Sequence, residues 1–177
     1  PSKDERSCGL AIDYSADRRA PGDTRPYVGW YPCRDYAKLI EAVKRSLHKV
    51  NPALEVILWS YNWGYCDEGP RRELIRLLPK DVPLLVTFEM FEKYRMRNGL
   101  DCKIADYSIA FEGPGKYFVS EAEEAKACGL KLYGMVNTAC RTWDLGVVPY
   151  MPVPYQWKRR WDAIRDARRK WGLRGLV

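Results

Sequence analysis

The chain has 177 residues, 46% of them apolar and 30% charged, an ordinary globular composition that is sufficient for one domain with its own core. No apolar run approaches the ~18 residues that a membrane span needs, and no signal-peptide pattern is visible, so we expect no membrane partner. The net charge of +7 is local, because eight basic residues face only two acidic ones between Met151 and Val177. The basic character therefore belongs to one segment and not to the whole surface.

The N-terminal segment, residues 1–31, is rich in Arg, Asp, Gly and Pro. We predict that it is irregular, with residues 8–14 as a candidate strand. The chain begins with Pro1 and not with Met, which favours a processed product or a fragment.

The six cysteines predict no zinc site, because none forms a CxxC pair and His48 is the single histidine. We therefore expect no metal, and no cofactor either. Cys66 falls in a predicted loop, while Cys8 and Cys33 stand at the first positions of a candidate strand and a predicted helix, next to loops. These three could pair in a secreted protein. They slightly favour a secreted or periplasmic location, which the cysteine count alone does not decide.

From residue 32 onward, apolar residues alternate between a helical and a strand period. Pro70 is placed to start the second helix of this series. The first four predicted elements are a helix at 33–51, a strand at 53–63, a helix at 69–80 and a strand at 82–90.

The second half of the chain continues the pattern after a loop. Ser120 and Glu123 form a capping box that predicts a helix start, and Gly129 and Gly172 suit helix ends. The predicted elements are a short strand at 107–111, a helix at 120–129, a strand at 130–138, a helix at 155–172 and a strand at 173–177.

Such alternation predicts an α/β fold with parallel strands and crossover helices. Two architectures fit, a doubly wound sheet and a (β/α)8 TIM barrel. No Gly-rich phosphate loop follows any strand, which weakens the nucleotide-binding sheet. The pattern supplies only about five parallel strands, so in the barrel architecture residues 32–177 would be a partial (β/α)8 barrel truncated at both ends.

Polar and aromatic residues gather after the predicted strands, where ligands bind in both architectures. Aromatic rings pack on sugar rings, and carboxylates and amides bind hydroxyl groups, so this set indicates a carbohydrate site. Asp67 also has a structural interpretation as a helix cap, and Asp144 as a turn residue. The predicted substrate-binding residues are Trp59, Tyr61, Asn62, Trp63, Asn137, Arg141, Trp143 and Tyr150.

Glu89 is the strongest catalytic candidate, because in "PLLVTFEMF" a predicted strand leads directly into it. An ionised carboxylate is costly to bury, so we expect this residue at an open, polar mouth. Its apolar neighbours Phe88 and Met90 would favour a raised pKa, as a general acid requires. Asp144 and Asp67 are the candidates for the second carboxylate.

Several stretches, among them "WSYNWG", "LLVTFEMFE" and "TWDLGVVPYMPVPYQW", resemble glycoside-hydrolase-type TIM barrels of large bacterial proteins related to the family 20 hexosaminidases. The resemblance covers most of residues 32–177 and implies the C-terminal part of such a barrel. Family 20 enzymes carry an adjacent Asp-Glu pair directly at a strand end. Asp67 and Glu68 lie several residues past the predicted strand here, so the family's substrate-assisted roles are not carried over to them, and Asp67 is a candidate only through its position.

The sequence thus predicts a carbohydrate-active protein that hydrolyses glycosidic bonds with a carboxylate pair at the strand ends. One alternative is a non-catalytic carbohydrate-binding barrel. A second is a basic nucleic-acid-binding domain acting through residues 158–170, which the acidic strand ends disfavour. The remaining expected partners are an oligosaccharide or polysaccharide and either missing barrel segments or further copies of the chain.

Overall fold

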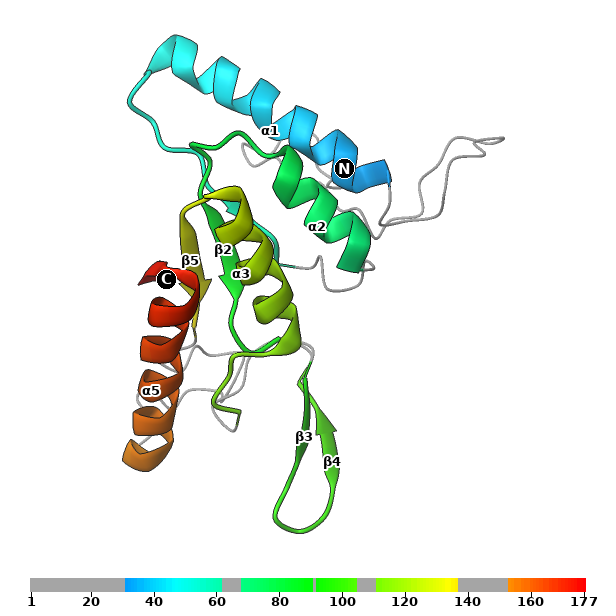
Figure 1. Cartoon of the computed structure of the whole chain (residues 1–177), viewed down its shortest axis with the longest axis vertical. Helices are drawn as coiled ribbons and strands as arrows, with labels where there is room; N and C mark the ends of the chain where they lie inside the picture. Colours follow the sequence, from blue (N-terminus) through cyan, green and yellow to red (C-terminus); the bar gives the residue numbers. More distant parts are fainter. Residues whose placement is uncertain (1–30, 62–67, 91, 105–110, 137–152) are drawn as a thin grey trace, which may run out of the picture.

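The computed structural model describes residues 31–61, 68–90, 92–104, 111–136 and 153–177 (Figure 1). These residues form a mixed α/β structure with a four-stranded parallel sheet and a separate two-stranded hairpin. The helices are α1 (Tyr31–Val50), α2 (Glu68–Leu77), α3 (Lys116–Cys128) and α5 (Pro154–Trp171). The strands are β1 (Leu58–Trp59), β2 (Leu84–Thr87), β3 (Lys93–Arg95), β4 (Asp101–Lys103), β5 (Leu132–Met135) and β6 (Leu173–Leu176).

The parallel sheet has the order β1-β2-β5-β6, so the predicted parallel strands and their sequential order are confirmed for these four. One prediction is wrong. A strand at 107–111 was expected between β2 and β5, but β2 pairs directly with β5, from Leu84 opposite Leu132 to Thr87 opposite Met135. Residues 107–110 of this predicted strand lie outside the described residues.

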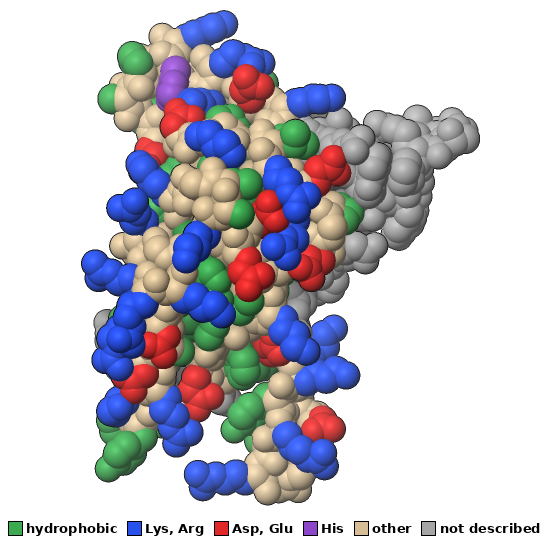
Figure 2. All heavy atoms as spheres, in the orientation of Figure 1, with side chains coloured by type: hydrophobic (Ala, Val, Ile, Leu, Met, Phe, Trp, Pro, Cys, Tyr) green, Lys and Arg blue, Asp and Glu red, His purple; other side chains and the backbone are tan. Residues whose placement is uncertain are grey.

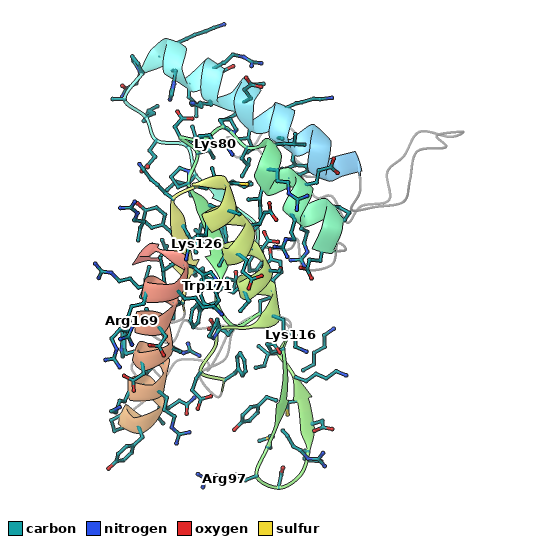
Figure 3. All side chains as sticks on the ribbon, viewed as in Figure 1. Lys80, Arg97, Lys116, Lys126, Arg169 and Trp171 are labelled. Carbon is teal, nitrogen blue, oxygen red and sulfur yellow. The ribbon has the colours of Figure 1, made fainter. Side chains whose placement is uncertain are left out.

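Helices α3 and α5 lie over one face of the sheet (Figure 1). Side chains alternate across a strand, and Leu84, Val86 and Phe88 of the β2 segment face this helical layer. Phe88 contacts Phe118 of α3 edge-on, and Phe118 in turn contacts Trp171, which points from α5 toward α3 (Figure 3). This chain of aromatic contacts joins strand and helices in one core.

β2 is buried on both of its faces. Leu85 and Thr87 alternate with the core residues and are also buried. Parallel strands are usually covered on both sides, which is why the sequence here reads as a continuous apolar run and not as an alternation.

The helix ends confirm two predictions and contradict one. Gly129 and Gly172 end α3 and α5 with φ of 70° and 72°, a left-handed conformation that glycine adopts without strain. The capping box is wrong, because α3 begins at Lys116 and Ser120 lies inside it, donating to the Tyr117 carbonyl. The Lys116 amide is capped instead by the Glu92 carboxylate, from a distant part of the chain.

The hairpin formed by β3 and β4 was not predicted. It projects from the body at the end of the sheet to which the strands point (Figure 1). Its turn contains Asn98 and Gly99, with a φ of 84° at the glycine. Asn-Gly between strands is a strong hairpin signal, so the sequence did contain the information.

Candidate functional site

The carboxyl ends of the parallel strands meet at one edge of the sheet, where β/α proteins usually bind their ligands. A buried ion pair lies just past the end of β2. The face of the sheet opposite Leu84, Val86 and Phe88 carries aromatic and hydroxyl groups.

Glu89 lies two residues past β2 and is fully buried. Its Oε1 atom is 3.2 Å from Nη1 of Arg160, which is itself only 1% exposed. Nη2 of Arg160 donates to the Phe111 carbonyl at 2.8 Å. The arginine therefore joins the end of β2, the segment that precedes α3, and helix α5.

The predicted open, polar environment of Glu89 is wrong. Arg160 belongs to the stripe of α5 that faces the core, together with Ile164, Ala167 and Trp171. Arg160 is one of the eight basic residues between Met151 and Val177 that make this segment cationic. One arginine in the apolar stripe of that helix supplies the charge that lets Glu89 be buried.

The opposite face of the sheet carries an aromatic row. Trp59, Leu85 and Tyr133 are partners in the strand register, so their side chains point to the same side. Gly175 of β6 completes the row, and a Cβ atom there would lie 3.3 Å from the Tyr133 ring. Glycine at this position leaves room for the ring to lie against the strand.

Trp59 is the accessible member of this row, with 42% of its surface exposed. Its ring centroid lies 4.9 Å from that of Tyr61, with the planes inclined by 50°. The backbone between them is held by Tyr117, whose hydroxyl donates to the Ser60 carbonyl. The aromatic pair is therefore fixed to the body at the end of β1.

Thr87 adds a polar group to the same face, one register step closer to the strand ends than Leu85. The residue is buried, and its Oγ1 atom has no hydrogen-bond partner among the described residues. Buried hydroxyl groups are normally paired, so a water molecule or a ligand group would have to reach this buried position to satisfy the atom.

A second buried ion pair lies between α2 and α3. Nη1 of Arg71 is 2.9 Å from Oε1 of Glu121, and the guanidinium also lies 4.8 Å from the centre of the Tyr117 ring. Burial raises the pKa of Glu121 to about 7, against the opposing effect of Arg71. This carboxyl group therefore titrates near neutral pH.

The outer part of the same interface holds a more exposed charge cluster. Arg72 and Arg76 of α2 both bond to Glu124 of α3, at 2.7 to 3.0 Å. Burial alone would raise the pKa of Glu124, but the two arginines lower it below its ordinary value. The two ion-pair systems fix how α2 and α3 lie relative to each other.

The described residues include three of the predicted site residues, Trp59, Tyr61 and Glu89. The structure brings the two aromatic residues together, as the strand spacing predicts, and buries the acid. Tyr133, Thr87 and Arg160 were missed, although the alternation of β5 and β2 could have indicated the first two. The other predicted site residues lie outside the described residues: Asn62, Trp63, Asp67, Asn137, Arg141, Trp143, Asp144 and Tyr150.

Within the described ranges, no group of three or more His, Cys, Asp or Glu side chains is arranged to hold a metal ion. None of the described helices is long and apolar enough to cross a membrane. Comparisons of the chain with known protein families, curated proteins and solved structures found no match.

Proposed function

We propose that this protein is a carbohydrate-active (β/α)8 barrel that binds a sugar chain at the carboxyl ends of its parallel strands. The observation that carries the proposal is the accessible Trp59 ring, held against Tyr61 at the end of β1. Sugar rings present flat C–H faces that pack on such rings, and specificity then needs a few well-placed polar groups. The Thr87 hydroxyl supplies one on the same face.

The barrel architecture is part of the proposal. Four parallel strands in sequential order, with crossover helices over one face, are compatible with part of a TIM barrel. A closed barrel has eight strands, so the proposal requires further strands beside β1 and β6, from other parts of the protein or from another copy of the chain.

Hydrolysis of glycosidic bonds is the second candidate function. It is favoured by the position of Glu89 at the end of β2, next to the strand that carries Trp59. A guanidinium at 3.2 Å favours an ionised carboxylate, which suits a nucleophile or an electrostatic stabiliser and not a general acid. The second carboxylate would be Asp67 or Asp144. The full burial of Glu89 favours binding over hydrolysis.

The third alternative, nucleic-acid binding through α5, has less support. Several basic side chains of this helix are paired with acids one turn away, Lys158 and Arg165 with Asp162, and Arg169 with Asp166. These pairs give the helix a mixed surface and not a continuous basic stripe.

Binding of soluble oligosaccharides, measured by calorimetry, tests the main proposal. Trp59→Ala should abolish or strongly weaken binding, because it removes the exposed ring. Trp161→Ala is the matched control, since Trp161 is 49% exposed but lies on α5. Equal affinities for wild type and Trp59→Ala, or binding by neither, would contradict the proposal.

Turnover distinguishes hydrolysis from binding. If Glu89 is catalytic, Glu89→Gln should abolish release of reducing sugar while binding persists, and Glu112→Gln, which removes an acid paired with Arg159, should not. Bound but uncleaved glycans in the wild type would favour the binding-only function.

A further inference from the structure

The β3–β4 hairpin separates charged from apolar side chains. In the two antiparallel strands, Lys93 lies opposite Lys103, Tyr94 opposite Cys102 and Arg95 opposite Asp101. Because side chains alternate, the first and third pairs share one face of the hairpin and the second pair lies on the other. One face is therefore cationic, with three basic residues and one acidic one.

The two lysines of this face directly oppose each other. The Ile104 amide donates to the Glu92 carbonyl at 2.7 Å, so these residues form a hydrogen-bonded pair. The next pair, Lys93 and Lys103, is then of the non-hydrogen-bonded kind, in which opposite side chains lie closer. Like charges in this position destabilise a hairpin.

Local acids do not neutralise this charge. Asp101 lies 3.8 Å from Arg95, while no described carboxylate pairs with Lys93, Lys103 or Arg97. Arg97 extends from the free end of the hairpin, and Lys116 lies near its base (Figure 3). An anionic group between the lysines would remove their repulsion and form charge-assisted hydrogen bonds.

The hairpin lies beyond the carboxyl ends of the parallel strands, at the end of the sheet where the sugar site is proposed (Figure 1). It follows β2 directly and projects beyond the strand ends, separated from the lower part of α5 by an open notch (Figure 2). Hydrophobic side chains border this notch on the side of the hairpin, while most of the hairpin's Lys and Arg side chains lie at its tip and on the side away from α5 (Figure 2). The cationic face of the hairpin and the proposed sugar site therefore belong to the same end of the molecule.

From this geometry we infer that the substrate is an acidic polysaccharide, whose carboxylate or sulfate groups bind the Lys93–Lys103 face of the hairpin. The inference rests on the proposed carbohydrate site and specifies its substrate class. A nucleic acid fits the hairpin less well. Single strands need aromatic rings among the basic residues, and Tyr94, the one aromatic residue of the two strands, is on the other face.

The affinities of the whole protein for polygalacturonate, dextran sulfate, uncharged dextran and double-stranded DNA test the inference at low and high salt. Either acidic glycan should bind more tightly than dextran, and its affinity should fall with salt. The double variant Lys93→Gln/Lys103→Gln should bind the acidic glycan roughly tenfold more weakly, the loss expected for one charge-assisted hydrogen bond.

Two further variants separate loss of binding from loss of structure. Lys103→Glu places opposite charges across the hairpin, so it should stabilise the hairpin and still weaken binding of the acidic glycan. Arg168→Gln/Arg174→Gln removes the same net charge from exposed residues of α5 and β6, and it should bind like the wild type.

The outcomes distinguish the two proposals. Equal binding of dextran and the acidic glycans, or unchanged affinity in the hairpin variants, overturns the acidic substrate and leaves the carbohydrate site standing. Absence of binding to any of the glycans overturns both. Tighter binding of DNA than of either acidic glycan, with the same dependence on Lys93 and Lys103, assigns the hairpin to a nucleic acid and overturns the inference.

Discussion

At the scale of single residues, two buried glutamates of the described structure each have an arginine from a neighbouring helix. Glu89 is paired with Arg160 of α5, and Glu121 with Arg71 of α2. A buried carboxylate without such a partner would be far less stable, because burial removes its hydration. The arginines are therefore part of the reason that these acids occupy core positions.

The Glu89–Arg160 pair gives a prediction for stability. Arg160→Met should lower the free energy of unfolding by about 3–5 kcal/mol, because it leaves a buried charge without its guanidinium. The double variant Arg160→Met/Glu89→Leu should recover a large part of that loss. Urea denaturation of the wild type, both single variants and the double variant measures the coupling. Simple additivity of the two single changes would contradict a direct interaction.

Glu121 predicts how stability depends on pH. Its pKa is raised from 4.5 to about 7 in the folded state, so the folded protein holds more protons than the unfolded chain between these values. This contribution is fully present below about pH 4.5 and is lost as the pH rises through 7, on the order of 3 kcal/mol at most. The free energy of unfolding, measured by urea denaturation, should therefore fall more between pH 5 and pH 8 for the wild type than for Glu121→Gln. Parallel curves would exclude Glu121 as the titrating group.

At the scale of elements, the sequence predicted those that depend on local periodicity and local stop signals. Gly129 and Gly172 were recognised as helix ends because the left-handed conformation is a property of the residue itself. The start of α3 was not, because its cap comes from Glu92, whose side chain lies 24 residues away along the chain. Contacts of this kind leave no local pattern to read.

The helix ends carry the third prediction. Gly129→Ala should destabilise the protein by roughly 1–2 kcal/mol, since an L-residue is strained at a φ of 70°. The matched control is Gly69→Ala in the first turn of α2, where a Cβ meets no atom within 4 Å and helix propensity favours alanine. The midpoint of thermal unfolding should thus fall for Gly129→Ala and rise for Gly69→Ala. The same shift in both would show that φ is not the cause.

At the scale of the whole molecule, stability should be unevenly distributed. β2 and β5 lie inside the sheet, whereas the hairpin projects from it with Leu100 61% exposed. Two-stranded hairpins are marginally stable alone. Amide hydrogen exchange should therefore be slowest at Leu85 and Val86 and faster by orders of magnitude at Tyr94 and Cys102. Comparable protection would show that the hairpin is covered in solution.

Of the candidate site, the proximity of two aromatic residues was predictable, and the surroundings of the acid were not. Strand ends and aromatic spacing located Trp59 and Tyr61 correctly, because the period of a strand decides which side chains share a face. Glu89 was placed in an open environment, because the charge that compensates its burial comes from Arg160, 71 residues later. Long-range charge compensation is decided by packing, and the sequence shows only that both charges exist.

The residue pair at the base of the hairpin has a consequence for the evolution of this protein. The Ile104 amide donates a hydrogen bond to the Glu92 carbonyl and so joins the two strands at the base of the hairpin. Ile104 is buried there. The segment between Glu92 and Ile104 can be lengthened, shortened or replaced while these two residues stay paired. A longer loop costs little stability. Proteins that differ from this one only in the hairpin would then keep the same sheet and the same aromatic row but differ in the charge they present beside it. Exchanging residues 93–103 between such proteins should transfer the preference for charge without refolding the body.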